Sequence, residues 1–167
     1  AALALADPTE GKPDSRDPWR RQDTRLAAAA LFFPPTDLLS FGGRRLDQAA
    51  LPAMNIPGLL YRGGHLADHD EPEIVERLQN ISPVHRFTQF SRRHPGSAPA
   101  PTILFHGTAD KTVPVDQAVR LHEILTRAGG ISRLVLKEGG GHPWMDNAPE
   151  LAEAVAWFRQ YLLNEGS

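Results

Sequence analysis

The sequence predicts an α/β fold in a single domain, with a parallel sheet flanked by helices. In the last third of the chain, short apolar runs alternate with amphipathic stretches in the order strand, helix, strand, helix, which is typical of parallel sheets. Another apolar run, near residue 30, has the length of a buried strand. The 167 residues suffice for one domain of ordinary size but not for two complete ones.

The N-terminal part is predicted to form the end of a helix, a surface loop and a strand. Ala1 to Ala6 contains only Ala and Leu, and no capping residue precedes it, so we expect the last turns of a helix that begins outside this chain. Residues 7–25 are rich in proline and charge, which is typical of a surface loop. Leu26 to Phe33 is apolar and stops at Pro34-Pro35, which favours a strand buried on both faces.

Residues 38–100 are predicted to be an excursion from the sheet. Turn signals such as Gly42-Gly43 and Pro95-Gly96 interrupt this stretch, and one segment alone has a convincing helical pattern. That helix starts at Glu71-Pro72 and ends before Ser82-Pro83. Because long excursions with little regular structure are often functional, we expect this one to contribute to a substrate pocket.

Two strands and two helices are predicted after residue 101. Thr102 to Phe105 and Leu134 to Leu136 are the strands. The helix between them spans residues 116–128, ends at Gly129-Gly130, and has on one face Ala118, Val119, His122 and Leu125. The final helix begins after the capping residue Asn147, and its periodicity predicts a sheet-facing stripe of Leu151, Ala154, Val155, Phe158 and Leu162.

The composition excludes several classes of function. The formal net charge is -2 and the basic residues are scattered, so nucleic acids and anionic lipids are not expected as partners. No apolar run approaches the ~20 residues that span a bilayer, and the N-terminus lacks the basic residues of a signal peptide. The absence of cysteine excludes disulfides, thiolate nucleophiles and zinc-thiolate sites. The cellular compartment stays undetermined.

Two polar turns follow the strands of the last third. The first contains Asp110, and the second contains His142 after three glycines. A right-handed crossover through the 116–128 helix places the two strands side by side, so both turns lie at the carboxyl edge of the sheet. Neighbouring strands are roughly 4.8 Å apart. We therefore expect the Asp110 carboxylate to meet the His142 imidazole and to fix its tautomer, as a hydrolytic general base requires.

These motifs resemble those of α/β-hydrolases of the esterase/lipase and prolyl-oligopeptidase-like group. Ile103 to Pro114 is similar to the acid loop of that family, and Gly140-Gly141-His142 to its histidine loop. Leu31 to Asp37 and Ile81 to Val84 are also similar to esterases of this group. The order of the acid before the histidine fits the chain order of the fold, which is Ser, then Asp or Glu, then His.

The resemblance implies a serine hydrolase that cleaves carboxylic esters through an acyl-enzyme. Asp110 would orient His142, which would act as general base and then as general acid. The implied substrate is a small-molecule ester, and no cofactor or metal is required. A prolyl-oligopeptidase-type peptidase shares the acid loop and stays open as an alternative.

The nucleophile motif of this family, Gly-x-Ser-x-Gly, does not occur in the chain. None of the serines lies between glycines at that spacing: Ser15, Ser40, Ser82, Ser91, Ser97, Ser132 and Ser167. Ala1 to Ala6 resembles the end of the helix that follows the nucleophile. We therefore expect the chain to be the C-terminal half of the fold, inactive by itself, with the serine before residue 1. A degenerate, non-catalytic domain that associates through the exposed sheet edge at Leu26 to Phe33 is the other alternative.

Several other polar residues have competing interpretations. Asp37 also follows a buried strand, so it is an alternative triad acid, and otherwise it caps its own loop. We expect His106 to bind backbone groups and His122 to be a satisfied core histidine. The pairs Arg20-Arg21 and Arg92-Arg93 are predicted to be solvated.

No metal or phosphate site is predicted. His65 and His69 would share one face of a helix, as in some metal sites, but Gly63-Gly64 argues against a helix start and no third ligand is positioned. Residues 139–141 are glycines, but they lack the Lys-Ser/Thr that completes a phosphate loop.

Overall fold

A three-stranded parallel sheet organises the protein. The computed structural model describes residues 1–43 and 72–163. Its strands lie in the spatial order β1 (Ala29–Phe32), β2 (Thr102–Gly107) and β3 (Ser132–Lys137). In the register of the sheet, Phe32 lies opposite Phe105, which lies opposite Val135. The predicted α/β fold class is confirmed.

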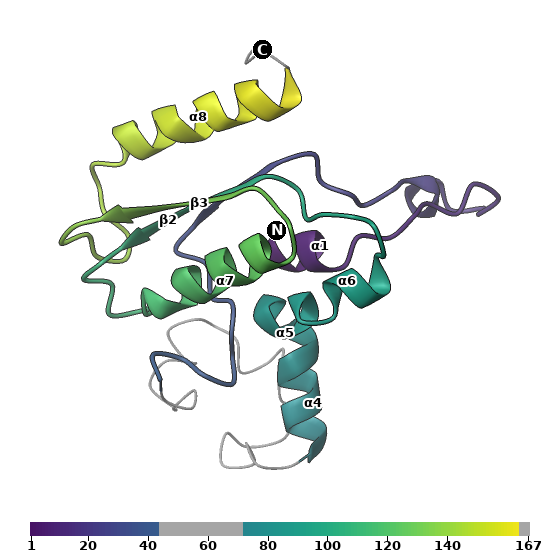
Figure 1. The fold of residues 1–167 in the computed structure, drawn as a ribbon, viewed down its shortest axis with the longest axis horizontal. Helices are drawn as coiled ribbons and strands as arrows, with labels where there is room; N and C mark the ends of the chain where they lie inside the picture. The colour runs from purple at the N-terminus through teal and green to yellow at the C-terminus, as the bar shows by residue number, and fades with distance from the viewer. Residues whose placement is uncertain (44–71, 164–167) are drawn as a thin grey trace.

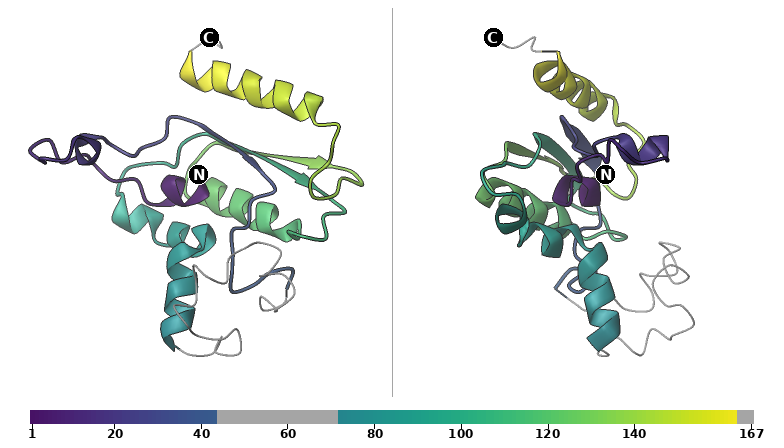
Figure 2. Two further views of the ribbon diagram at one scale, coloured as in Figure 1. Left: turned by 180° about the vertical axis from the view of Figure 1, so that it is seen from behind. Right: turned by 90° about the vertical axis from the view of Figure 1, so that its right-hand side faces the viewer.

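Helices cover the two faces of the sheet unequally (Figures 1 and 2). On one face, α8 (Ala148–Leu162) packs against β1 and β2. On the other face, α7 (Asp116–Arg127) packs against β2 and β3. Next to α7 lie α1 (Ala2–Ala6) and α5 (Pro83–Phe87), which contact each other.

The remaining described segments extend away from these layers. The chain between α1 and β1 projects outward as a loop with one 3-10 turn, η1 (Pro18–Arg21), as predicted for a surface loop. α4 (Pro72–Ile81) points away from the sheet and is followed by α5 and by α6 (Phe90–Arg93). The sequence predicted α4, whereas α5 and α6 are too short for a periodic pattern.

The core consists of one apolar cluster on each side of the sheet. The side chains of β2 alternate, so that Leu104 joins the cluster beneath α7 while Ile103 and Phe105 join the one beneath α8. All three are fully buried, as expected for a central strand covered on both faces. β1 is shorter than predicted and only half covered, because Ala29 and Leu31 are buried while the alternate residues are partly exposed.

The buried stripe of α8 differs from the prediction by one position. Leu151, Val155 and Leu162, expected to face the sheet, are about half exposed. Ala154 is buried as predicted, and the other buried residues of the helix are Glu150 and Trp157. The helix carries two apolar stripes offset by one residue, and the indole determines which one is buried. Trp157 fills the space above the sheet, and its Nε1 donates to the carbonyl of Pro101 at 3.3 Å.

α7 is likewise rotated slightly from its predicted orientation. Ala118 and Leu125 are buried as expected, but Leu121 takes the central place beside them. His122 is half-buried, and its Nδ1 lies 2.9 Å from the hydroxyl of Ser132. This histidine is therefore satisfied, although it lies at the margin of the core.

The prediction that both residues of the Arg92-Arg93 pair are solvated is wrong for Arg93. Its guanidinium binds the carboxylate of Asp7 and donates to the carbonyl of Ala6 at 3.1 Å. Arg86 binds the same carboxylate. Asp7 directly follows α1, so these contacts connect the end of α1 to α5 and α6. Arg92 is exposed, as expected.

Among the described residues, no helix combines the length and the apolar character that crossing a bilayer requires. In the same residues, no group of three or more His, Cys, Asp or Glu side chains is arranged to hold a metal ion. His65 and His69 lie outside the described residues.

Replacement of Leu104 by Ala tests the importance of the central strand. We expect Leu104→Ala to lower the free energy of unfolding by about 2–5 kcal/mol, because a fully buried leucine leaves a cavity between β2 and α7. Leu136→Ala on β3 is the matched control, since this side chain is 47% exposed. Urea denaturation of both variants provides the measurement, and equal losses would contradict the assignment of the core.

Candidate active site

The loops that follow β2 and β3 are joined by backbone hydrogen bonds. The N–H of Thr108 donates to the carbonyl of Lys137 at 2.9 Å, and the N–H of Ala109 donates to the carbonyl of Gly140 at 3.0 Å. The hydroxyl of Thr108 accepts from the N–H of Gly139 at 2.9 Å. The two loops therefore act as one structural unit at the carboxyl edge of the sheet.

Glycine is required where the loops approach each other most closely. A Cβ atom on Gly107 would lie 2.2 Å from the carbonyl oxygen of Gly140. A Cβ atom on Gly140 would in turn lie 2.8 Å from the side chain of Lys137. No side chain fits between these backbones, so the absence of Cβ atoms lets the loops meet.

Asp110 and His142 meet at the tips of these loops, as the strand order predicted. Oδ2 of the Asp110 carboxylate lies 2.7 Å from Nδ1 of His142. The other oxygen, Oδ1, accepts from the N–H groups of Thr112 at 2.8 Å and Val113 at 2.9 Å. The Asp110 side chain is fully buried. Its charge is thus satisfied by three donors in fixed positions.

The carboxylate determines the tautomer of the His142 ring. A carboxylate oxygen accepts, so Nδ1 of His142 carries the proton and Nε2 presents a lone pair. In the described part of the chain Nε2 makes no hydrogen bond, and the side chain is 24% exposed. The ring can therefore accept a proton at Nε2 from a group that approaches from outside.

An aromatic wall borders the His142 ring. The ring of Phe33, just beyond β1, meets it edge to face with centroids 4.4 Å apart. Trp144 contacts Phe33 in turn, with centroids 5.6 Å apart. The sequence did not predict the contact between Phe33 and His142. That contact depends on the unusual backbone of Phe33, whose φ is +37°, a strained conformation for a residue with a bulky side chain.

The histidine loop is anchored at its far end by Lys137. The ammonium donates to the carbonyl of Asp146 at 3.0 Å and lies 3.1 Å from Oε1 of Glu150. Burial opposes the charged form of Glu150, but hydrogen bonds from its own N–H and from Lys137 outweigh burial and lower the pKa of this carboxyl. The predicted cap at Asn147 makes no side-chain hydrogen bond. The first turn of α8 is held instead by the ion pair between Lys137 and Glu150, which the sequence did not reveal.

His106 binds the backbone, as predicted. It belongs to the end of β2, its ring is fully buried, and Nε2 lies 2.8 Å from the carbonyl oxygen of Val113. Burial disfavours the charged ring and lowers the pKa of His106.

Asp37, the alternative acid, does not contact His142. Its Oδ1 accepts from the N–H groups of Leu39 and Ser40 at 3.0 and 3.1 Å, which is the predicted loop-capping role. Its Oδ2 accepts from Arg120 at 2.6 Å, and His85 Nε2 lies 3.1 Å from Oδ1. These partners come from α7 and α5, so the carboxylate connects the loop after β1 to both helices.

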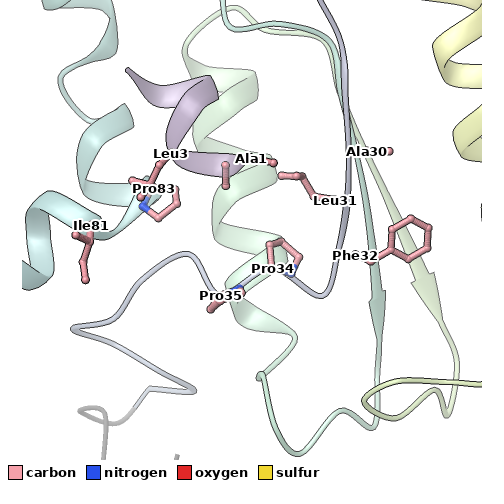
Figure 3. Close-up of a pocket in the computed structure, with 10 residues that line it drawn as sticks. Ala1, Leu3, Ala30, Leu31, Phe32, Pro34, Pro35, Ile81 and Pro83 are labelled. Carbon is pink, nitrogen blue, oxygen red and sulfur yellow. The ribbon is translucent and has the colours of Figure 1, made fainter. Parts of the chain in front are cut away.

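A pocket of about 330 Å³, lined by residues with apolar side chains, lies beside β1 (Figure 3). Pro83 and Ile81 of the excursion contribute to its lining, whereas Asp110 and His142 do not line it. Among the described residues, β1 pairs with β2 alone, so the pocket borders a free strand edge. Its lining consists of Ala1, Ala2, Leu3, Ala30, Leu31, Phe32, Pro34, Pro35, Ile81 and Pro83.

Comparison with known proteins identifies related sequences. Residues 61–165, more than half of the chain, match the prolyl oligopeptidase family. The non-reducing polyketide synthase ausA of Emericella nidulans is 35% identical over 85 residues, which make up 51% of this chain and 3% of that protein.

Solved structures of hydrolases share the fold. A truncated carbohydrate esterase from gut microbiota has a TM-score of 0.67 at 18% identity, covering 96% of this chain and 54% of its own. An esterase of Thermogutta terrifontis has a TM-score of 0.60 at 24% identity, covering 99% and 53%. A puromycin-hydrolyzing peptidase of Mycobacterium tuberculosis has a TM-score of 0.55 at 23% identity, covering 81% and 18%. The chain thus spans about half the length of the two esterases.

Substitution of Gly107 tests the close approach of the two loops. We expect Gly107→Ala to lower the free energy of unfolding by about 1–3 kcal/mol, because the new methyl group displaces the Gly140 carbonyl. Gly141→Ala is the matched control, since a Cβ there has no neighbour within 4 Å. Thermal or urea unfolding of both variants is the measurement. A tolerated alanine at position 107 would contradict this packing.

The lowered pKa of His106 predicts a loss of stability in mild acid. The unfolded chain protonates this ring near the ordinary pKa of about 6.5, whereas the folded chain resists protonation until the pH is lower. Stability is therefore unaffected by this group above that pH and falls as the pH decreases below it, by about 1.4 kcal/mol per pH unit at most.

Urea unfolding at pH 7.5 and pH 5.5 measures this loss. His106→Gln, which cannot titrate, is expected to lose less stability between the two values than the wild type. Equal losses in the two proteins would show that another group causes the acid sensitivity.

Proposed function

Because this chain belongs to the prolyl oligopeptidase family, we propose that it carries the acid and the general base of a serine hydrolase that cleaves carboxylic esters. The observation that supports this most directly is the contact of 2.7 Å between Asp110 Oδ2 and His142 Nδ1. With Nδ1 protonated, Nε2 of His142 has the lone pair that a general base needs. The ester preference is supported by the resemblance of Leu31 to Asp37 and of Ile81 to Val84 to esterases, and by the esterases among the solved structures that share the fold.

In the proposed reaction, His142 moves one proton in each direction. Nε2 takes the proton of a serine hydroxyl while the serine oxygen bonds to the ester carbonyl carbon. The resulting imidazolium is stabilised by Asp110 and gives its proton to the alkoxide that leaves, so an acyl-enzyme and a free alcohol form. Water then reacts by the same two steps, which releases the acid and restores the hydroxyl.

We propose that the serine comes from a segment outside these 167 residues that is adjacent to the free edge of β1. The chain has no Gly-x-Ser-x-Gly motif, and β1 exposes an unpaired edge among the described residues. The pocket at this edge offers space for side chains of an added strand. By itself, the chain would then lack the nucleophile and be inactive.

Peptide hydrolysis is the second candidate activity. It is favoured by the match of residues 61–165 to the prolyl oligopeptidase family. The Asp110–His142 pair serves amide cleavage equally well, because the same imidazolium protonates a leaving amine. A non-catalytic domain that associates through the β1 edge is the remaining alternative.

Kinetics of a protein that joins this chain to the proposed serine-bearing segment test the proposal. We expect it to hydrolyse short acyl esters, and Asp110→Asn and His142→Gln to lower kcat/KM by about 10³- to 10⁴-fold. His122→Gln, on the outer margin of α7, should leave kcat/KM unchanged. The 167-residue chain alone should be inert.

The same protein assayed with proline-containing peptides separates the two activities. Turnover of peptides without turnover of esters would replace the esterase proposal with the peptidase. Full activity of the Asp110 and His142 variants would exclude both.

A further inference from the structure

His106 is a buried imidazole that the proposed mechanism does not use. It lies four residues before Asp110, at the end of β2. Its Nε2 is 2.8 Å from the carbonyl oxygen of Val113 and 3.5 Å from Oδ2 of Asp110. Its Nδ1 is buried and has no hydrogen-bond partner among the described residues. Of the two ring nitrogens of His106, only Nε2 therefore makes a hydrogen bond among the described residues.

The Val113 carbonyl determines where the His106 proton lies. A carbonyl oxygen accepts and never donates, so Nε2 of His106 is the protonated nitrogen and Nδ1 holds a lone pair. Leaving a buried polar atom such as Nδ1 without a partner costs free energy. An aliphatic side chain would fill the same space without that cost, so packing alone does not account for the imidazole.

Val113 connects His106 to the acid through a single residue. Its carbonyl oxygen accepts from His106, while its N–H donates to Oδ1 of Asp110 at 2.9 Å. The carbonyl and the N–H belong to the two peptide groups on either side of the Val113 Cα, so fixing the carbonyl limits, across a single residue, the orientations open to the N–H that holds the carboxylate. With Oδ1 held, the other oxygen, Oδ2, points at Nδ1 of His142.

We propose that His106 is a positioning residue for Asp110, which it orients toward His142 through the backbone of Val113. The contact of 3.5 Å between Nε2 and Oδ2 adds an electrostatic preference for the same carboxylate orientation. The expected effect of His106 on kcat rests on the proposed function. The expected effect of His106 on the orientation of the Asp110 carboxylate does not.

Two variants separate positioning from packing. In His106→Gln the amide nitrogen occupies the place of Nε2 and can still donate to the Val113 carbonyl. In His106→Asn the side chain is one atom shorter, so its amide nitrogen takes the place of Nδ1 and cannot reach that oxygen. Both replacements are polar, neutral and similar in size.

Proton NMR of the 167-residue chain provides a readout that requires no catalysis. The His142 Nδ1–H that donates to Asp110 should give a downfield resonance that is protected from exchange with water. We expect this resonance to persist in His106→Gln and to shift upfield or broaden in His106→Asn, with other dispersed signals retained. An unchanged resonance in His106→Asn would overturn the proposal.

The wild-type chain gives a second test that does not depend on the folding of a variant. Nitrogen-15 NMR should show the His106 ring as the Nε2–H tautomer at neutral pH. An Nδ1–H tautomer would overturn the proposal, because that ring could not donate to Val113.

In a protein that joins this chain to the proposed serine-bearing segment, His106→Asn should lower kcat on esters by up to about 100-fold with KM unchanged, and His106→Gln should restore most of the loss. Equal kcat values in the two variants would overturn the kinetic part of the inference. Should the wild-type protein prove inactive on esters and peptides, the proposed function fails, whereas the NMR outcomes still decide the role of His106.

Discussion

The contact between the backbones of Gly107 and Gly140 is the constraint on which the candidate site depends. It lets the loops after β2 and β3 share hydrogen bonds, so that the tips of the two loops move together. A side chain at Gly107 would push the loops apart and stretch the backbone hydrogen bonds that join them. Asp110 and His142 would then lose their contact even if neither residue changed. The geometry of the site is thus a consequence of how two parallel strands pair.

The buried carboxylate of Asp110 is held mainly by groups that cannot move independently. Two of its donors are the backbone N–H groups of Thr112 and Val113, and the third is His142. Backbone donors carry no rotamer entropy of their own, which makes them efficient partners for a buried charge. The Asp110 carboxylate is therefore held in one orientation, and its electrostatic field acts on the His142 imidazole from a fixed direction. Charged groups that are fixed in advance in this way are called preorganised.

Much of the fold and the central contact of the site could be predicted because they depend on local patterns. The alternation of strands and helices, together with the right-handed crossover between parallel strands, sufficed to predict that Asp110 meets His142. The orientation of α8 was not predictable from periodicity, since two apolar stripes compete and the bulk of Trp157 decides between them. Phe33 was missed because its contact depends on a left-handed backbone beyond the strand end. The ion pair between Lys137 and Glu150 was missed because it depends on tertiary structure and not on a local pattern.

Apart from Phe33, the groups that orient the proposed general base belong to one continuous stretch of chain, from Thr102 to Glu150. This stretch is a single strand–helix–strand unit with the start of the following helix. Its Asp110–His142 contact joins residues 32 positions apart, whereas the paired residues of β1 and β2, such as Ala29 and Thr102, are 73 positions apart (102 − 29). Local closures of this kind cost little chain entropy and form early relative to distant strand pairings. The contacts around Asp110 and His142 therefore form a module that can organise itself within one strand–helix–strand unit.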